Sequence, residues 1–375
     1  MITNTLHIIT SLNIGGAESM LHRLIKFKPE LIDSTIVVSL TDDGKIGLML
    51  KDMGVTVISL EMHNWFSILS VIFKLKKIIQ KEKPKIIHTW MYHANLLGGI
   101  AELMANNKNI IWSIRRSNLK YSESISTFFV MKIGALLSNI IPRKIVSVAE
   151  SGVKNHEKYG YKKNKMIVIP NGFDLIKLKR DLLQRKIIRR KLDIFDDQLI
   201  IGSVGRFHDS KDYESLVASA PAVIRKFKNI KYMLIGRDID SKNFTLMNWI
   251  AKTGYSSHFL LLGEINDVAK YMSAMDIFCL SSITEGFPNV VGEAMSMALP
   301  CVVTDVGDIK KLVGDTAIIV EPSNKQMLSQ GLCEMLSHNT VKRNKIGLKG
   351  RQKVEGEFPL SLFCKKYYEL YASMS

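Results

Sequence analysis

The chain has 375 residues, which is too long for one ordinary hydrophobic core, so we expect two domains. Its residues are 46% hydrophobic and 23% charged, a composition that excludes a disordered or fibrous protein. The formal net charge of +17 indicates an anionic partner or a role in solubility. The four cysteines lack a C-x-x-C spacing, which argues against a zinc site or a disulfide framework and favours a reducing compartment.

Strand and helix patterns alternate along the first half of the chain. The N-terminus leads directly into an apolar strand without a long signal region, so we expect no secretion signal. Such alternation predicts a parallel sheet that is covered by helices. The expected strands are 6–10, 34–40, 55–60, 85–88, 110–114 and 144–148, and the expected helices are 17–27, 67–81 and 125–137.

The second half repeats this scheme and ends in an amphipathic helix at 360–372. Its expected strands are 199–204, 231–235, 259–262, 277–280, 301–304 and 317–320, with helices between them. The two halves join near Pro170-Asn171-Gly172. We therefore expect two Rossmann-like domains that bind ligands at the carboxyl ends of their strands.

Two glutamates stand eight positions apart near the C-terminal end, with a Gly-Phe-Pro turn after the first. Glu285 lies in the expected loop and Glu293 about one turn inside an expected helix, 290–298. Such a pair is usually solvated surface. Here Glu293 is the only charge on a small-residue helix between two apolar strands, and a carboxylate in that setting needs a partner. Carboxylates accept hydrogen bonds from sugar hydroxyls, and a helix N-terminus binds phosphate.

Two cations and two glycines follow other expected strands. Arg206 and Lys211 lie five positions apart after the strand 199–204, a spacing that suits a diphosphate, although solvated surface charge is the ordinary alternative. Gly15 and Gly16 follow the first strand and allow the backbone to approach a ligand closely, although a plain tight turn is equally consistent with them.

Five segments together resemble, in order and from end to end, motifs of retaining GT-B glycosyltransferases of family GT4. Each segment is weak evidence alone. The segments are an N-terminal glycine loop at 13–18, a histidine segment at 86–95, an inter-domain linker at 168–174, a Gly-Arg…Lys element at 201–211 and the glutamate motif at 281–304.

This resemblance implies an α/β fold of GT-B type, in which two facing Rossmann-like domains enclose an inter-domain cleft. Residues 1–172 would form an N-terminal acceptor-binding domain, with the terminal helix 360–375 packing back on it. Residues 173–359 would form a C-terminal domain that binds the nucleotide-sugar donor.

The resemblance also implies roles for single residues. Arg206 and Lys211 would neutralise the diphosphate leaving group, so no metal and no other cofactor is expected. Glu285 would bind hydroxyls of the donor sugar, Glu293 would bind the ribose, and His93, rather than His88, would lie beside the donor sugar. The anomeric configuration would be retained by front-face attack. The remaining expected contacts are Gly15 and Gly16 near the diphosphate, the backbone at Gly286, Phe287, Pro288 and Asn289, and Ile265 at the base.

The expected partners are a nucleotide sugar, chiefly a UDP-hexose or UDP-N-acetylhexosamine, and a polyisoprenyl-diphosphate saccharide. Most of the basic excess precedes Leu178, and lysines between 74 and 85 flank apolar residues, which favours an anionic membrane surface. The segment 128–141 is too short to span a bilayer but could lie in its interface. Nucleic acid is disfavoured because the basic residues are not interleaved with aromatic ones. We expect a cytoplasmic protein at the inner face of the membrane.

Two alternatives stay open at this point. A UDP-sugar 2-epimerase uses the same fold, but that family normally carries a different carboxylate and histidine set. A non-catalytic basic binding protein would account for the charge but not for the glutamate pair with Arg206 and Lys211. A nicotinamide oxidoreductase is excluded because the first loop lacks G-x-G-x-x-G.

Overall fold

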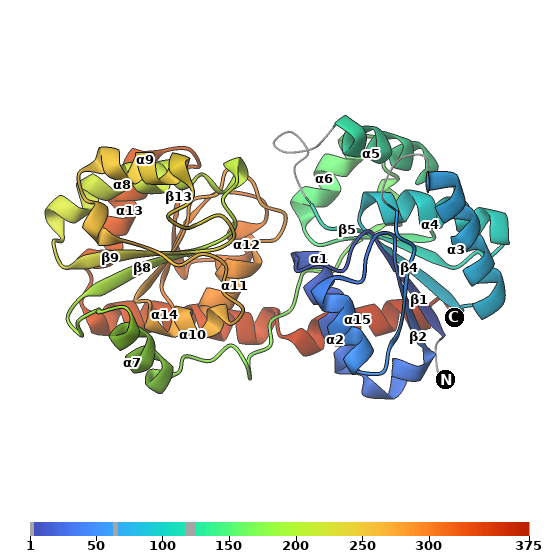
Figure 1. Cartoon of the computed structure of the whole chain (residues 1–375), viewed down its shortest axis with the longest axis horizontal. Coiled ribbons are helices and arrows are strands. Elements are labelled where there is room, and N and C mark those ends of the chain that lie inside the picture. Colours follow the sequence, from blue (N-terminus) through green and yellow to red (C-terminus); the bar gives the residue numbers. More distant parts are fainter. Residues whose placement is uncertain (1–3, 63–66, 117–124, 375) are drawn as a thin grey trace. The chain divides into compact units, whose positions relative to one another are not determined.

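The computed structural model describes residues 4–62, 67–116 and 125–374. The chain divides into two compact units (Figure 1). The N-terminal unit comprises Met1–Gly172 and Leu360–Ser375, and the C-terminal unit comprises Phe173–Pro359. The last helix of the chain therefore belongs to the first unit rather than to the second.

The N-terminal unit is built on a parallel sheet that has, within the described residues, the strand order β3-β2-β1-β4-β5-β6-β7. Its strands are β1 (Thr5–Ile9), β2 (Thr35–Ser39), β3 (Thr56–Ser59), β4 (Ile86–Trp90), β5 (Ile110–Ile114), β6 (Lys144–Ser147) and β7 (Met166–Val168). Its α-helices are α1 (Gly16–Phe27), α2 (Gly44–Asp52), α3 (Ile68–Glu82), α4 (Tyr92–Ala105), α5 (Ile125–Leu137), α6 (Glu150–Lys158) and α15 (Leu360–Ala372).

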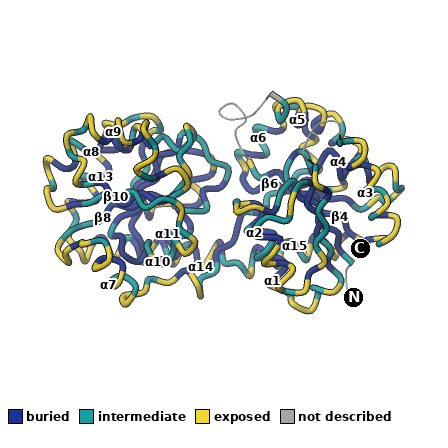
Figure 2. Tube along the Cα trace, viewed as in Figure 1, coloured by how far each residue is buried: buried dark blue, intermediate teal, exposed yellow. Residues whose placement is uncertain are grey.

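Helices cover both faces of this sheet, so the central strands β1, β4 and β5 are buried along their length, whereas the edge strands β3 and β7 are only partly buried (Figure 2). Helices α3, α4 and α5 pack on one face, where Leu75, Leu97 and Met131 join one core cluster. Helices α1, α2 and α15 lie on the other face, where Leu24 and Tyr367 join a second cluster. Figure 1 shows these two groups of helices on opposite sides of the strands.

Helix α15 is fastened to the sheet by a buried polar network. The Nδ1 atom of His88 and the hydroxyl of Tyr371 form a hydrogen bond of 2.6 Å, and Nε2 of His88 and Oγ of Ser113 form one of 2.7 Å. Burial holds the pKa of His88 well below its usual value, so the imidazole is neutral near pH 7. His88 therefore has a structural position in the core and joins β4 to the end of the chain.

Helix α5 contains most of the apolar segment that was predicted to suit a membrane interface. Its Val130 and Met131 are buried in the core, whereas Phe129 and Ile133 are 61% and 45% exposed. Among the described residues, no helix is both long and apolar enough to cross a membrane. Helix α5 thus has one face in the protein core and a second apolar face that is open.

The C-terminal unit repeats the architecture with a parallel sheet of order β10-β9-β8-β11-β12-β13 in the described chain. Its strands are β8 (Leu199–Val204), β9 (Ile230–Ile235), β10 (Phe259–Leu261), β11 (Ile277–Leu280), β12 (Cys301–Thr304) and β13 (Ala317–Val320). Its α-helices are α7 (Leu182–Lys191), α8 (Tyr213–Lys226), α9 (Phe244–Thr253), α10 (Val268–Ala274), α11 (Asn289–Ser296), α12 (Ile309–Val313), α13 (Lys325–Ser337) and α14 (Thr340–Glu357).

The predicted α/β class with two Rossmann-like domains is confirmed, and most expected elements differ from the observed ones only by a residue or two at their ends. Strand β7 was not predicted; it is three half-buried residues long and meets the segment interpreted as a linker, 168–174, at Val168. The helix predicted over 290–298 is α11 and ends at Ser296. Ala298 has a φ of +55°, a left-handed conformation that cannot continue a helix.

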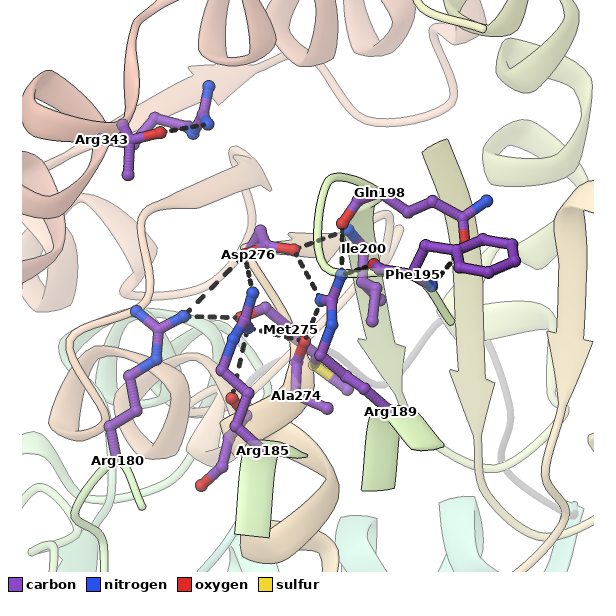
Figure 3. A network of polar contacts seen from close by, with 12 residues as sticks. Arg180, Arg185, Arg189, Phe195, Gln198, Ile200, Ala274, Met275, Asp276 and Arg343 are labelled. Carbon is purple, nitrogen blue, oxygen red and sulfur yellow. Dashed lines mark hydrogen bonds and ion pairs between the residues drawn. The ribbon is translucent and has the colours of Figure 1, made fainter. Parts of the chain in front are cut away.

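Helix α7 is attached to the C-terminal sheet through one aspartate (Figure 3). Asp276 accepts hydrogen bonds from Arg185 (2.7 Å), from the almost fully buried Arg189 (3.3 Å) and from the backbone N–H of Ile200 (2.9 Å). Arg180 lies 3.9 Å from the same carboxylate. Carbonyls at the end of α10 accept further bonds from these arginines. The charges of Arg180, Arg185 and Arg189 are thus compensated by the carboxylate of Asp276 and by the negative C-terminal end of α10.

We expect Asp276→Ala to destabilise the C-terminal unit by about 3 kcal/mol or more, because it leaves buried guanidinium groups without their carboxylate. The matched control is Glu357→Ala, which removes an exposed i,i+4 pair with Lys353 and should cost less than about 1 kcal/mol. Urea unfolding followed by circular dichroism measures both changes. Equal losses in the two variants would contradict the interpretation of Asp276.

Candidate active site

The C-terminal sheet reverses its strand order between β8 and β11. In open parallel sheets, ligands bind at the carboxyl ends of the strands at such a reversal, because the following loops diverge there and leave a crevice. The loop after β8 carries Arg206 and Lys211, and the loop after β11 carries Glu285. The fold thus brings together the cations and the first glutamate that the sequence analysis selected separately.

Lys211 and Glu285 form an ion pair across this point. The ammonium nitrogen of Lys211 lies 2.6 Å from Oε1 of Glu285, and the two side chains are only 21% and 14% exposed. The hydroxyl of Ser282 donates a second hydrogen bond, of 2.8 Å, to the same oxygen. Because the pair is largely shielded from water, its geometry is better fixed than that of a surface pair.

The loops after β8 and β11 are also joined by hydrogen bonds to backbone carbonyl oxygens. The hydroxyl of Ser281 donates to the carbonyl oxygen of Lys211 (2.8 Å), and the N–H of Ile283 donates to the carbonyl oxygen of Ser210 (2.9 Å). Thr304, at the end of β12, donates to the carbonyl oxygen of Ser282 (2.6 Å). These bonds hold Lys211 and Glu285 on a rigid base.

Two glycines allow the backbones around the site to approach closely. Gly307 has a φ of +55°, and a Cβ atom there would lie 2.5 Å from the carbonyl oxygen of Glu285 and 2.8 Å from that of Gly286. At Gly236, whose φ is +152°, a Cβ atom would lie 1.9 Å from the carbonyl oxygen of Gly205. The loop after β11 therefore needs glycine at position 307 beside it, and the loop after β8 needs glycine at position 236.

Phe287 anchors the segment between Glu285 and helix α11. Its ring is buried, with its centroid 6.2 Å from that of Phe173 and 5.7 Å from that of Phe358. A Cβ atom at Gly292 would collide with the Phe173 ring, so α11 packs directly on this aromatic group. The Phe287 side chain is thus occupied by packing, and only its backbone could contact a ligand.

Helix α11 begins at Asn289, directly after Pro288, and has no side-chain hydrogen bond at its N-cap. The first turn of a helix presents N–H groups without intrahelical partners, which can bind anions. Glu293 is half-buried in the second turn. Gly286 and Pro288 therefore lie between Glu285 and the helix that carries Glu293, and Asn289 is the first residue of that helix.

Two further predicted residues lie on loops at the same sheet edge. Arg206 is exposed and directly follows Gly205 at the end of β8. Ile265 is half-buried in the loop after β10, which is separated from β8 by β9. Among the described residues, no group of three or more histidine, cysteine, aspartate or glutamate side chains gathers as a metal site.

The N-terminal sheet has an equivalent reversal between β1 and β4. Gly15 and Gly16 follow β1 at the start of α1. Gly15 lies against the buried carboxylate of Glu18, since a Cβ atom at Gly15 would lie 2.3 Å from Oε2 of Glu18. Burial raises the pKa of Glu18, an effect that the charges of Arg115 and Arg116 partly offset.

The sequence analysis missed Glu18 and Arg115. Arg115 directly follows β5, donates a hydrogen bond of 2.5 Å to the Oδ1 atom of Asn171 and lies 5.3 Å from the centre of the Trp90 ring. Its Nη1 atom is buried and has no hydrogen-bond partner. The position of Arg115 at the end of an expected strand was a signal that could have identified it.

His93 lies in the first turn of α4, just after β4, and is half-buried. Burial lowers its pKa, so the imidazole is neutral near pH 7. It is one of the few polar residues lining an otherwise apolar cavity between α3, α4 and α5. His88, by contrast, is enclosed in the core.

Comparison with protein families matches most of the chain. The Glycosyl transferases group 1 model matches residues 184–353, and the Glycosyltransferase Family 4 model matches residues 14–177. The fold and these family matches thus define a glycosyltransferase of GT-B architecture. The chain belongs to family GT4.

Individual relatives are distant but cover much of the chain. A Staphylococcus aureus protein, capsular polysaccharide biosynthesis glycosyltransferase CapM, is 25% identical over 318 residues, which are 82% of this chain and 81% of the relative. The UDP-Gal:alpha-D-GlcNAc-diphosphoundecaprenol alpha-1,3-galactosyltransferase of Escherichia coli is 25% identical over 245 residues, 64% of this chain and 63% of the relative. Among solved structures, Anabaena HepE in complex with UDP has a TM-score of 0.87 at 19% identity, covering 99% of this chain and 100% of its own.

We expect Gly307→Ala to lose more stability than Gly254→Ala. Both glycines have a positive φ, so alanine at either position should cost about 1 kcal/mol in backbone strain. Only at Gly307 does the new Cβ also meet backbone atoms of the Glu285 loop, whereas nothing lies within 4 Å at Gly254, so Gly307→Ala should cost about 1–3 kcal/mol more. Urea unfolding measures the difference, and equal losses would show that the loop moves aside freely.

Proposed function

We propose that this glycosyltransferase retains the anomeric configuration and transfers a hexose or N-acetylhexosamine from a UDP donor to a lipid-linked saccharide in cell-surface polysaccharide assembly. The observation that carries the proposal is the shielded Lys211–Glu285 pair at the β8–β11 reversal. The names of the relatives support the biological setting, since they include a capsular polysaccharide enzyme and a galactosyltransferase that acts on a diphosphoundecaprenol-linked sugar.

The C-terminal unit has the groups that a nucleotide sugar needs. We assign the diphosphate to Lys211 and Arg206, which offer a point charge and a planar fork. Glu285 would accept hydrogen bonds from hydroxyls of the donor sugar, and Glu293 would accept those of the ribose. The backbone from Gly286 to Asn289 would supply N–H donors, and the loop at Ile265 would contact the base. Solved structures of HepE with UDP and with UDP-glucose support this kind of donor.

The position of Glu285 favours front-face attack over a double displacement. A nucleophilic carboxylate must be able to bond to the anomeric carbon. The Oε1 atom of Glu285 already accepts bonds from Lys211 and Ser282, which stabilise its charge and lower its nucleophilicity. In the proposed mechanism the leaving phosphate accepts the proton of the acceptor hydroxyl, and Glu285 positions the donor sugar instead of attacking it.

Charge on the departing UDP would be neutralised by side chains. As the glycosidic bond breaks, negative charge grows on the diphosphate, and cations already positioned there stabilise the transition state more than the ground state. Lys211 and Arg206, both on the loop after β8, would take this role. We therefore propose a transferase that needs no metal ion or other cofactor.

We assign the acceptor and the membrane surface to the N-terminal unit. Helix α3 carries Lys74, Lys76, Lys77 and Lys81 and no acidic residue before Glu82. Each such cation near an anionic surface contributes about 1 kcal/mol of attraction. We propose peripheral association with the inner face of the cytoplasmic membrane and a polyisoprenyl-diphosphate saccharide as acceptor. Sedimentation with anionic vesicles should decrease as salt rises, and no binding at low salt would contradict this part of the proposal.

A nucleotide-sugar screen tests the proposed function. UDP-hexoses or UDP-N-acetylhexosamines should raise the melting temperature by mass action. With the matching donor, UDP should be released only when a lipid-linked saccharide is added, and the rate should survive EDTA. Glu293→Ala should weaken donor binding by about 1.5–3 kcal/mol in a folded protein. Loss of activity in EDTA, or transfer from no UDP-sugar, would contradict the proposal.

The Lys211→Ala variant tests the catalytic role of the ion pair. We expect kcat to fall by about 10²–10³-fold, with a smaller change in KM, because the charge that Lys211 compensates develops during the reaction. Steady-state kinetics of UDP release measure both constants. Lys310→Ala is the control, since it removes an exposed ion pair with Asp305 in the same unit and should leave both constants unchanged. A purely structural role of Lys211 would lower the melting temperature without this selective loss of kcat.

A further inference from the structure

The N-terminal unit contains an open apolar cavity of about 480 Å³ between α3, α4 and α5. Its walls include Ile72 on α3 and Phe129 and Ile133 on α5, and Leu97 on α4 lies at its base. The volume lies within the range of about 300–1,000 Å³ that is typical of small-molecule sites. Nothing in the proposed donor chemistry uses this cavity, which we call the α3–α5 groove.

The groove is lined almost entirely by hydrocarbon. His93 and Ser126 are the polar residues among the described residues that line it. On its walls Phe129 and Ile133 are 61% and 45% exposed, and on α3 the side chain of Phe73 is 52% exposed. Large apolar side chains around an open apolar cavity mark a surface that binds an apolar partner, because leaving them in water is unfavourable.

Helix α3, one wall of the groove, is basic, which suits a partner that carries an anionic group. Helix α3, which forms one wall, has lysines at 74, 76, 77 and 81. Helix α5, which forms the other, has Lys132 as its one charged residue. A neutral apolar segment of a protein would gain nothing from these cations. A hydrocarbon chain attached to phosphate groups would suit both the apolar groove and the basic helix that forms one of its walls.

The position of His93 relates the groove to the chemistry of this unit. His93 follows β4, at the sheet edge where the order of strands reverses and where Gly15 and Gly16 follow β1. His93 lines the groove together with Ile133 and other residues of α3, α4 and α5. A chain lying in the groove would therefore hold its attached head group near the edge of the sheet that carries the candidate site residues.

We propose that the α3–α5 groove binds the first isoprene units of the polyisoprenyl chain of the acceptor. This inference rests on the proposed function and deepens it, since it specifies how the lipid part of the substrate is recognised. The chain would pack on Ile72, Leu97, Phe129 and Ile133, while the attached diphosphate lies near His93. The enzyme would then select its acceptor by the lipid as well as by the sugar.

The test is isothermal titration calorimetry of the full chain with inorganic diphosphate and with dimethylallyl, geranyl and farnesyl diphosphate. Affinity should rise at least tenfold from the dimethylallyl to the farnesyl compound, because each added methylene leaves water. The double variant Phe129→Ser/Ile133→Ser should lose at least tenfold in farnesyl diphosphate affinity and keep that for inorganic diphosphate. Both replaced side chains are partly exposed, so the fold should tolerate the change.

The matched control is Leu136→Ser on the same helix. Leu136 is 76% exposed and does not line the groove, so this variant should bind farnesyl diphosphate as the wild type does. Ile133→Trp, which fills the groove instead of making it polar, should reproduce the loss of the double variant. If Phe129→Ser/Ile133→Ser fails to fold, Ile133→Trp alone decides the question.

Several outcomes would overturn the assignment. These are an affinity that is independent of chain length, a double variant that binds like the wild type, and displacement of farnesyl diphosphate by phosphatidylglycerol vesicles, which would assign the groove to bilayer lipid. A dimer that the double variant dissociates in sedimentation would assign it to a second copy of the chain. UDP binding, measured on the same samples, distinguishes failure of this inference from failure of the proposed function, since UDP binding does not depend on the groove.

Discussion

The candidate site depends on one topological constraint, the reversal of strand order between β8 and β11. Lys211 and Glu285 are 74 residues apart, yet they form an ion pair because the two strands that precede them are neighbours in the sheet. Every further stabilising feature acts on this juxtaposition. Ser281 and Ser282 join the loops, and Gly307 lets a third loop approach the backbone of Glu285. Changes at any of these positions would displace the ion pair, even though only Lys211 and Glu285 carry charge.

The same constraint acts in the N-terminal unit but brings together different chemistry. Between β1 and β4, the reversal places Gly15 and Gly16 near the residues that lead into α4. The buried carboxylate of Glu18 packs against the glycine loop, and His93 opens onto an apolar groove. One rule of parallel sheets thus yields a polar edge in one unit and a partly apolar edge in the other. This division suits an enzyme whose proposed donor is an anion and whose proposed acceptor carries a hydrocarbon chain.

Much of the fold could be predicted from the sequence because buried parallel strands are short apolar runs, as in Ile277–Leu280 and Cys301–Thr304. The pairing of Lys211 with Glu285 could not, since strand order is set by tertiary packing and not by periodicity. The Phe287 ring illustrates the same limit. Its partners Phe173 and Phe358 come from the two ends of the C-terminal unit, so no local pattern reveals that Phe287 is a packing anchor. Arg115 was missed for a different reason, because its position after an expected strand is a signal that does not by itself distinguish it from a solvated cation.

Helix α5 shows why the groove in particular could not be predicted. Its sequence is apolar on nearly every side and carries the single charge of Lys132, so periodicity cannot separate a face in the protein core from a face toward another partner. The structure separates them, because Val130 and Met131 are buried while Phe129 and Ile133 remain open. The lysines of α3 have a similar ambiguity in sequence, where they suit a membrane surface as well as a phosphate group. The structure resolves the first ambiguity, because α3 and α5 form two walls of one cavity that His93, just after β4, also lines.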